Sequence, residues 1–181
     1  MKDRSILVGV TGGIAAYKTA ALVSRLAQAG AQVQVVMTRA ATHFVGPATF
    51  AALTGKMVAT DVVDPHHCPL GWHVTLAQQT DLLCVAPATA NFLAKAALGL
   101  ADDLLTTTFL AFDGPTLVAP AMNPDMWSKP AVQRNVRQVK QDGAIIIGPE
   151  EGWVSCRRSG VGRMVDPEKI FQEIQLQLQD L

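Results

Sequence analysis

The stretch ILVGVTGGIAAYK, residues 6–18, decides the fold of this chain. Residues 6–10 are apolar or small and predict a strand buried on both faces. Gly12 and Gly13 then form a tight turn, and residues 14–28 have helical composition. Glycines between a buried strand and a helix let backbone N–H groups approach an anion at the helix N-terminus. The stretch therefore predicts the first unit of an α/β protein with an anion site at its turn.

The same alternation of strand and helix continues along the chain. Further apolar runs lie at residues 33–37, 57–63, 82–86, 116–119 and 144–147, and helical patterns lie at 49–53, 90–97 and 130–140. The run at 57–63 is the weakest of these. Alternating strands and helices indicate a parallel sheet covered on both faces. We predict one three-layer α/β domain over residues 1–181, Rossmann-like or flavodoxin-like. Residues 150–163 are expected to form a long loop that acts as a flexible flap, and residues 167–181 a final helix capped by Asp166.

Composition excludes several classes of function. The chain has 181 residues, enough for one ordinary domain, with 15 basic and 15 acidic residues. This balance gives neither a nucleic-acid-binding field nor a polybasic membrane anchor. We expect no signal peptide and no spanning helix. Three irregularly spaced cysteines do not form a disulfide framework, so a reducing cytoplasm is expected. A net charge of zero lowers the barrier to self-association.

The glycine turn does not match the common nucleotide motifs. It is neither a G-x-G-x-x-G fingerprint nor a Walker A loop. A dinucleotide site usually has an acidic residue after the second strand, to hold a ribose. Residues 37–44, MTRAATHF, offer hydroxyl groups and a cation there. This disfavours NAD and favours a mononucleotide that ends in a phosphate, with NADP as a rival.

Polar residues also follow two later strands, where ligands bind in open α/β sheets. Residues 119–127, APAMNPDMW, place Asn123 past a strand end. A simple strand-to-helix turn with Pro124 at its start explains the prolines, but not Asn123 or the surrounding methionines and tryptophan. Thr89 and Asn91 follow the run at 82–86, and helix capping explains them equally well.

Three other groups have an ordinary explanation beside a functional one. Asp102 and Asp103 are more typical of a helix start than of catalysis. His66, His67 and Cys68 suggest a metal site, but a solvent loop suits them better because zinc sites need four convergent ligands; we predict no metal. Cys156 could be a small packing residue. Three nearby arginines and two glycines instead indicate a reactive thiol on a segment that can bend.

Several segments together resemble one family. Residues 120–127 fit P-x-M-N-x-x-M-W, the substrate-recognition motif of the flavin-dependent cysteine decarboxylases. Other segments of the chain also match the family and occur in the family's order. They are T-G-G-I-A-A at 11–16, M-T-x-x-A-x-x-F at 37–44, H-V-T-L at 73–76, the stretch 86–105, and C-x-x-x-G-x-G-R-M at 156–164. The chain departs from the family at Arg157 and Arg158, where a glycine and an acidic residue are common.

The resemblance implies a cofactor, FMN, and a set of site residues. The residues it assigns to the flavin are Gly12, Gly13, Thr38, Phe44, Ala88, Thr89 and Asn91. His73, expected at the ligand edge, would act as base or electrostatic partner. Asn123 would bind the substrate carboxylate, and Cys156 would protonate the product. Asn123, Met126 and Arg163 would contact the substrate.

The resemblance also implies a reaction and an assembly. Within the family, the chain most resembles the enzymes that decarboxylate 4'-phosphopantothenoylcysteine to 4'-phosphopantetheine in coenzyme A biosynthesis. The flavin oxidises the thiol carbon, which makes loss of the β-carboxylate feasible. The alternatives are a peptidyl-cysteine decarboxylase, a flavin prenyltransferase of related fold, and a non-catalytic regulatory flavoprotein. A homotrimer or a dodecamer of trimers is expected, with the flavin between subunits.

Overall fold

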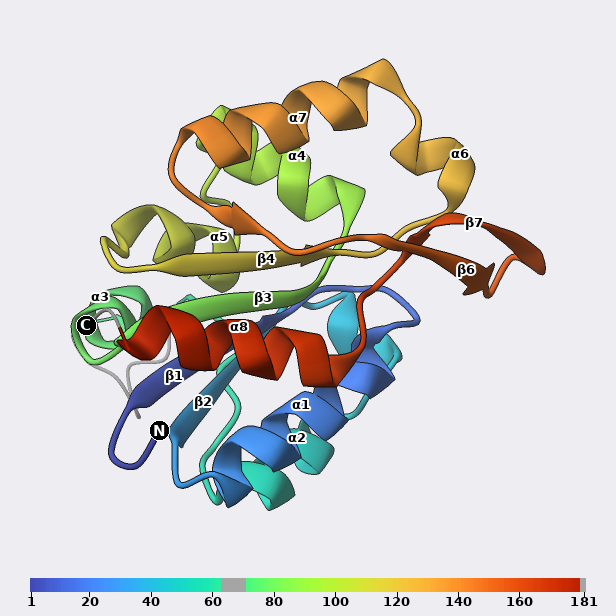
Figure 1. Cartoon of the computed structure of the whole chain (residues 1–181). Helices are drawn as coiled ribbons and strands as arrows, with labels where there is room; N and C mark the ends of the chain where they lie inside the picture. Colours follow the sequence, from blue (N-terminus) through green and yellow to red (C-terminus); the bar gives the residue numbers. More distant parts are fainter. Residues whose placement is uncertain (63–70, 180–181) are drawn as a thin grey trace.

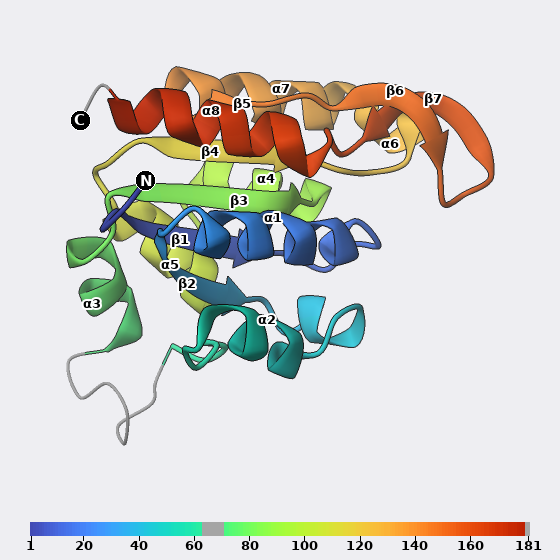
Figure 2. The same cartoon turned by 60° about the horizontal axis from the view of Figure 1, so that its bottom comes forward.

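The computed structural model describes residues 1–62 and 71–179 (Figure 1). Its main sheet has five parallel strands in the order β2-β1-β3-β4-β5, which confirms the predicted class and is the flavodoxin-like order. The strands are β1 (Ser5–Val10), β2 (Gln32–Met37), β3 (Leu82–Ala88), β4 (Thr116–Pro120) and β5 (Ile145–Ile146). Figure 2 shows β4, β3, β1 and β2 one below the other.

Helices cover both faces of this sheet. They are α1 (Ala16–Gln28), α2 (Pro47–Thr54), α3 (Trp72–Gln78), α4 (Ala90–Leu98), α5 (Leu104–Ala111), α6 (Pro124–Trp127), α7 (Pro130–Gln141) and α8 (Pro167–Gln179), with a 3-10 turn, η1, at Ala41–His43. Side chains of α1, α2 and α8 share one apolar core, and those of α3, α4, α5 and α7 share the other. The result is the predicted three-layer arrangement.

Alternation along β1 supplies both cores. Ile6 and Val8 belong to the core under α1, and Leu7 belongs to the core under α5. All three are almost fully buried, as expected for a central strand of a parallel sheet. Gly9 lies so close to Leu105 of α5 that a Cβ atom would overlap its side chain. This glycine therefore lets α5 pack directly on the strand.

The weakest predicted strand does not form. Within residues 57–62, Ala59 alone pairs with β2, through one isolated bridge to Val36. The residue after Ala59 bonds locally instead of pairing with β2. The Thr60 hydroxyl donates to the side chain of its neighbour Asp61 at 2.8 Å. Residue 63, the end of this predicted run, lies outside the described residues.

The segment predicted as a long loop is a β-hairpin, and this prediction was wrong. Strand β6 (Glu150–Val154) pairs antiparallel with β7 (Arg158–Arg163), apart from the main sheet. Glycines and arginines hide strand character in a sequence, because strands are usually recognised by β-branched and aromatic residues. In Figures 1 and 2 the hairpin projects beyond the carboxyl ends of the main strands. The final helix, α8, begins at Pro167 as predicted.

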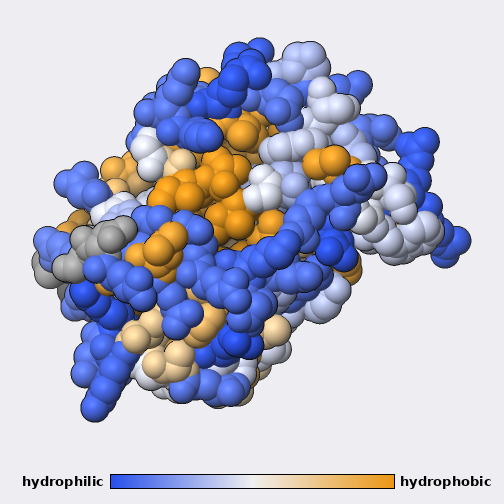
Figure 3. All heavy atoms as spheres, viewed as in Figure 1, coloured by the Kyte–Doolittle hydropathy of each residue, from blue (hydrophilic) through white to orange (hydrophobic). Residues whose placement is uncertain are grey.

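Two surface features complete the fold. No helix within residues 1–62 and 71–179 combines the length and apolar character needed to cross a membrane. Figure 3 shows apolar side chains gathered between α7 and α8, over the edge of the sheet that β5 forms. Ile145 and Ile146 of β5 are half-buried there.

Candidate functional site

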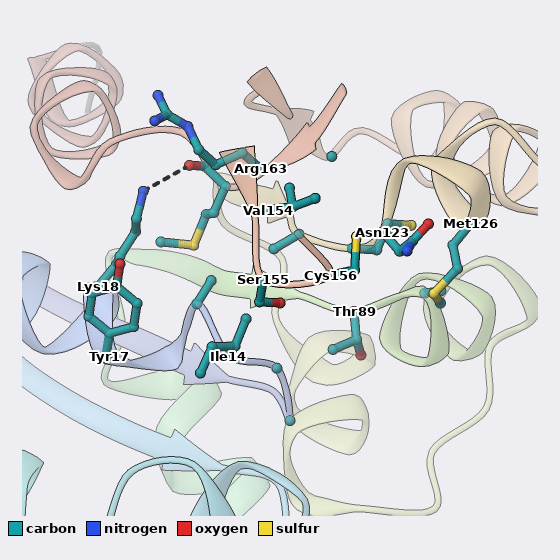
Figure 4. A pocket seen from close by; sticks show the side chains of 18 of the residues that line it. Ile14, Tyr17, Lys18, Thr89, Asn123, Met126, Val154, Ser155, Cys156 and Arg163 are labelled. Atoms are coloured by element: carbon teal, nitrogen blue, oxygen red, sulfur yellow. Dashed lines mark hydrogen bonds between the residues drawn. The ribbon is translucent and has the colours of Figure 1, made fainter. Parts of the chain in front are cut away.

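A cavity of about 600 Å³ lies at the carboxyl edge of the sheet. Its walls come from the turn after β1, the segments after β3 and β4, and the β6–β7 hairpin. Figure 4 shows side chains from these segments around one space. Seven predicted site residues line it: Gly12, Gly13, Thr89, Asn123, Met126, Cys156 and Arg163. In open α/β folds this edge is where ligands bind, beside the point at which strand order reverses.

The turns after β1 and β3 are joined by Thr11. Its buried hydroxyl donates to Pro87 O at 2.7 Å and accepts from Thr89 N at 3.0 Å. Gly12 packs so tightly on Ala40 that a Cβ atom would overlap it. A Cβ atom on Gly13 would meet Thr89 at 3.6 Å, an ordinary contact. Gly12 is therefore required by packing between turns, and Gly13 leaves the cavity floor open.

Thr89 caps a helix and also lines the cavity. It is the N-cap of α4 and accepts from Phe92 N at 3.3 Å, and it also lines the cavity. Asn91 is exposed on the first turn of α4 and does not line the cavity. Ala88 is the buried last residue of β3.

Thr38 and Phe44 follow β2, outside the cavity wall. Thr38 Oγ1 accepts from Ala41 N at 3.3 Å and so stabilises the start of the 3-10 turn η1. Phe44 ends that turn with 49% of its surface exposed. A large exposed aromatic side chain at the ligand edge is available to a ligand or to another chain.

The orientation of Asn123 follows from its hydrogen bonds. Asn123 is the N-cap of α6, and its Oδ1 accepts from Asp125 N at 2.7 Å. Because the oxygen is used, the Nδ2 group is the part of the amide left to donate to a ligand. Pro124 is the first helical residue, as the simple-turn interpretation required. Asn123 thus caps α6 and lines the cavity at the same time. Its Nδ2 group can donate a hydrogen bond to a carboxylate.

Cys156 lies in the turn of the hairpin, between β6 and β7. It is exposed and lines the cavity with Ser155. Cys84 is fully buried in β3, and burial raises the pKa of its thiol to about 12. Cys84 is therefore inert, and Cys156 is the accessible one of these two thiols.

The arginines near Cys156 are less free than the sequence suggested. Arg158 Nη1 pairs with Asp125 Oδ2 at 2.8 Å, and Arg163 Nη2 pairs with Glu150 Oε2 at 3.2 Å. Part of Arg163 lines the cavity, but its guanidinium points away from it (Figure 4). The predicted electropositive surroundings are thus partly neutralised by carboxylates.

The base of the hairpin is held by an ionic network. Glu150 also pairs with Lys169 of α8, and the hydrogen bond from Lys169, together with that from Arg163, holds the pKa of Glu150 below its usual value. Lys18 of α1 donates to Met164 O at 3.4 Å and pairs with Asp166 at 3.3 Å. These contacts join the hairpin base to α1 and α8.

His73 does not reach the cavity, contrary to the expectation that it lies at the ligand edge. It is on α3, which leads into the amino end of β3. Figure 1 places α3 at the end of the sheet opposite the hairpin. The H-V-T-L segment forms a helix that precedes its strand, so His73 lies toward the amino edge of the sheet. The buried Nδ1 atom of His73 has no hydrogen-bond partner among residues 1–62 and 71–179.

The metal interpretation gains no support. The described residues contain no group of three or more His, Cys, Asp or Glu side chains that could hold a metal ion. His66, His67 and Cys68 lie outside the described residues.

Several cavity residues were not predicted. Ile14, in the turn before α1, and Tyr17, in the first turn of α1, line the cavity and are more than half exposed. Their i, i+3 spacing after the glycine turn could have indicated this shared face. Trp153 lines the cavity from β6 with 65% exposure, but nothing in its neighbouring sequence predicts a strand.

These features define a class and then a family. A five-stranded parallel sheet of this order, with a cavity at its carboxyl edge beside β1 and β3, is typical of flavodoxin-like cofactor-binding proteins. A family model described as Flavoprotein matches residues 1–179. The chain belongs to this flavoprotein family.

Relatives are found among curated proteins and solved structures. The chain is 48% identical over 172 residues to the coenzyme A biosynthesis bifunctional protein CoaBC of Bacillus subtilis, covering 95% of this chain and 42% of the relative. It is 42% identical over 171 residues to CoaBC of Haemophilus influenzae, covering 94% and 43%. The chain thus spans about two fifths of the length of these relatives.

Two solved structures are similar over nearly their whole length. The FMN-dependent cysteine decarboxylase SpaF is 41% identical with a TM-score of 0.84, and the alignment covers 98% of this chain and 96% of SpaF. A cysteine-to-serine variant of PPC decarboxylase, complexed with pantothenoylaminoethenethiol, is 28% identical with a TM-score of 0.87, and the alignment covers 98% and 100%.

Proposed function

We propose that this chain is an FMN-dependent decarboxylase that converts 4'-phosphopantothenoylcysteine to 4'-phosphopantetheine in coenzyme A biosynthesis. The observation that carries the proposal is one cavity lined by Gly13, Thr89, Asn123 and Cys156. These residues come from four separate segments, and all four segments match the family pattern. Similarity to CoaBC proteins favours the phosphopantothenoyl substrate.

The cavity floor fits the phosphate end of a flavin mononucleotide. Gly13 leaves space there, and the first helical turn of α1 begins at Ala16. Among the described residues the Ile14 N–H donates to no acceptor, so it is available to an anion at this helix N-terminus. Gly12, Gly13 and Thr89 would hold the flavin, with Ala88 and Asn91 beside them and Thr38 and Phe44 after β2. Bound FMN supplies a two-electron sink next to the substrate thiol.

The chain's own residues position the substrate and move a proton. Asn123 Nδ2 donates to the substrate carboxylate and fixes its direction, while Met126 contacts the apolar part of the substrate. Cys156, on the hairpin turn, donates the proton that the decarboxylated product needs. Arg163, also predicted to bind substrate, supports the hairpin through Glu150 in this conformation.

His73 requires a second copy of the chain in this proposal. It lies at the opposite end of the sheet from the cavity of its own chain, so a neighbouring copy would supply it as base or electrostatic partner. Ile14, Tyr17 and Phe44 expose large apolar surfaces near the cavity edge, which a subunit contact would cover. These exposed side chains support self-association, and the family resemblance implies its form, a homotrimer or a dodecamer of trimers. We propose that this assembly acts in the cytoplasm.

A peptidyl-cysteine decarboxylase is the second candidate. SpaF, an FMN-dependent cysteine decarboxylase, is 41% identical to this chain, and the two CoaBC relatives are 48% and 42% identical to it. Steady-state kinetics of the FMN-loaded protein separate the two candidates. We expect kcat/KM for phosphopantothenoylcysteine to exceed that for a peptide ending in cysteine by at least about 100-fold, the size of an ordinary specificity difference. The reverse order would favour the peptide enzyme. Release of carbon dioxide from neither substrate would favour a regulatory flavoprotein.

A further inference from the structure

One ion pair joins the tip of the hairpin to helix α6. Arg158 Nη1 lies 2.8 Å from Asp125 Oδ2. Arg158 is two residues after Cys156, and Asp125 is two residues after Asn123. The pair therefore connects the two segments that carry the proposed proton donor and the proposed carboxylate ligand. The roles assigned above use neither Arg158 nor Asp125.

On one side of the pair, Asp125 is bonded to Asn123. The Asp125 N–H donates to Asn123 Oδ1 at 2.7 Å, and Asp125 O accepts from the Ser128 hydroxyl at 3.2 Å. Helix α6 has four residues, too few to be stable without tertiary contacts. A displacement of Asp125 would therefore be transmitted to the Asn123 amide.

On the other side, β7 lies directly against the segment that precedes α6. Met122 N donates to Gly162 O at 2.9 Å, and a Cβ atom on Gly162 would overlap Met122 O. A Cβ atom on Gly160 would lie 2.9 Å from Pro124. Between Gly160 and the turn, the Arg158–Asp125 pair is the polar contact to α6 among the described residues.

We infer that Arg158 is a positioning residue that acts through Asp125 to hold Cys156 over the cavity beside Asn123. The inference rests on the proposed decarboxylation. The side chains of Arg158 and Asp125 are 66% and 70% exposed, so their attraction is weak and screened by salt. A weak latch holds the hairpin over bound substrate and still lets it open for exchange. Turnover should therefore fall as ionic strength rises.

Charge reversal tests the latch in the FMN-loaded protein. We compare Arg158→Glu, Asp125→Arg and the double variant that carries both changes, with phosphopantothenoylcysteine as substrate. At low salt, each single change should lower kcat/KM two- to tenfold, and the double variant should recover to within about twofold of wild type. High salt should bring wild type toward the single variants. Arg134→Glu is the matched control, because it reverses the same charge at an exposed arginine of α7 that does not line the cavity and has no ion pair among the described residues; it should leave kcat/KM unchanged.

A second measurement does not depend on turnover. Hydrogen–deuterium exchange of the peptide that spans residues 154–160, followed by mass, reports how often the hairpin turn loosens; in wild type the turn is closed by the bond from Arg157 N to Val154 O. Exchange should be faster in both single variants than in wild type and should return to the wild-type rate in the double variant. If wild type releases no carbon dioxide, the proposed function fails while this measurement still tests the latch. If both single variants exchange and turn over as fast as wild type, the inference is overturned. A double variant that is no better than the single variants would overturn it as well.

Discussion

At the scale of single residues, Arg157 adopts a backbone conformation that favours glycine. Arg157 has φ 60, in the left-handed region that favours glycine, and its N–H donates to Val154 O at 2.9 Å. The family pattern expected from the sequence has glycine after the cysteine, and the hairpin turn here has the conformation that glycine adopts without strain. Arg157 is therefore a strained residue of this turn.

A pair of substitutions at Arg157 measures this strain. Arg157→Gly and Arg157→Ala both remove the side chain, but only glycine adopts a positive φ freely. The left-handed penalty of about 1–2 kcal/mol exceeds the extra unfolded-state entropy of glycine, about 0.4–1 kcal/mol. Arg157→Gly should therefore be more stable than Arg157→Ala by about 0.5–1 kcal/mol in urea denaturation. Equal stabilities would mean that the turn relaxes to another conformation.

At the scale of elements, the acidic pair after α4 is structural, as its position in the sequence suggested. Asp103 is the N-cap of α5 and forms a capping box with Thr106, accepting from Thr106 N at 2.9 Å. Lys95 of α4 pairs with Asp103 at 2.9 Å and with Asp102 at 2.6 Å. These contacts fix the start of α5, which packs on β1 at Gly9.

Substitutions at Asp103 should separate its charge from its cap. Burial alone would raise the pKa of Asp103, but hydrogen bonds from Thr106 and Lys95 hold that pKa below its ordinary value. A lowered pKa stabilises the fold above the unfolded-state pKa of about 3.9, and this contribution is lost as pH falls through the lower folded value. At neutral pH, Asp103→Asn should cost about 0.5–1 kcal/mol and Asp103→Ala about 1–2 kcal/mol.

Stability measured by denaturant titration across pH checks this assignment. The difference between wild type and Asp103→Asn should shrink as pH falls below about 4. The additional loss in Asp103→Ala should persist, because asparagine still caps the helix. A difference between wild type and Asp103→Asn that is constant with pH would show that the charge of Asp103 contributes nothing.

Elements were predictable from the sequence where apolar runs were long. The runs that became β1, β3 and β4 are buried on both faces, as expected for central strands of a parallel sheet. The hairpin was missed because its strands carry Gly152, Gly160 and Gly162, which sequence patterns assign to loops. Those at 160 and 162 are explained by contact with Met122 and Pro124, a tertiary requirement that local patterns do not carry.

At the scale of the whole molecule, the sequence predicted which segments of the chain line the cavity. It did not predict that His73 lies away from that cavity. Parallel strands bring their carboxyl ends to one edge, so residues after β1, β3 and β4 were expected to meet. His73 is placed by α3. No motif in the sequence specifies where α3 lies relative to the sheet. In our proposal, two copies of the chain are required to bring His73 and Cys156 into one site.

Mixing two inactive variants tests this shared site. His73→Asn and Cys156→Ser should each abolish formation of the reduced product while keeping FMN bound. In mixed oligomers, random pairing leaves roughly a quarter of the interfaces with both wild-type residues, so about that fraction of activity should return. Remixing His73→Asn with itself is the control. If the subunits are shown to exchange and no activity returns, His73 and Cys156 belong to the site of one chain, and the shared site is wrong.

The most direct test of the proposed decarboxylase is the product formed by the wild-type protein. Purified FMN-loaded protein is incubated with phosphopantothenoylcysteine under anaerobic conditions, and the product mass and the flavin absorbance are followed together. We predict a product lighter than the substrate by one carbon dioxide, with its thiol reduced and the flavin oxidised at the end of turnover. Recovery of unchanged substrate from protein that holds FMN and forms oligomers would contradict the account.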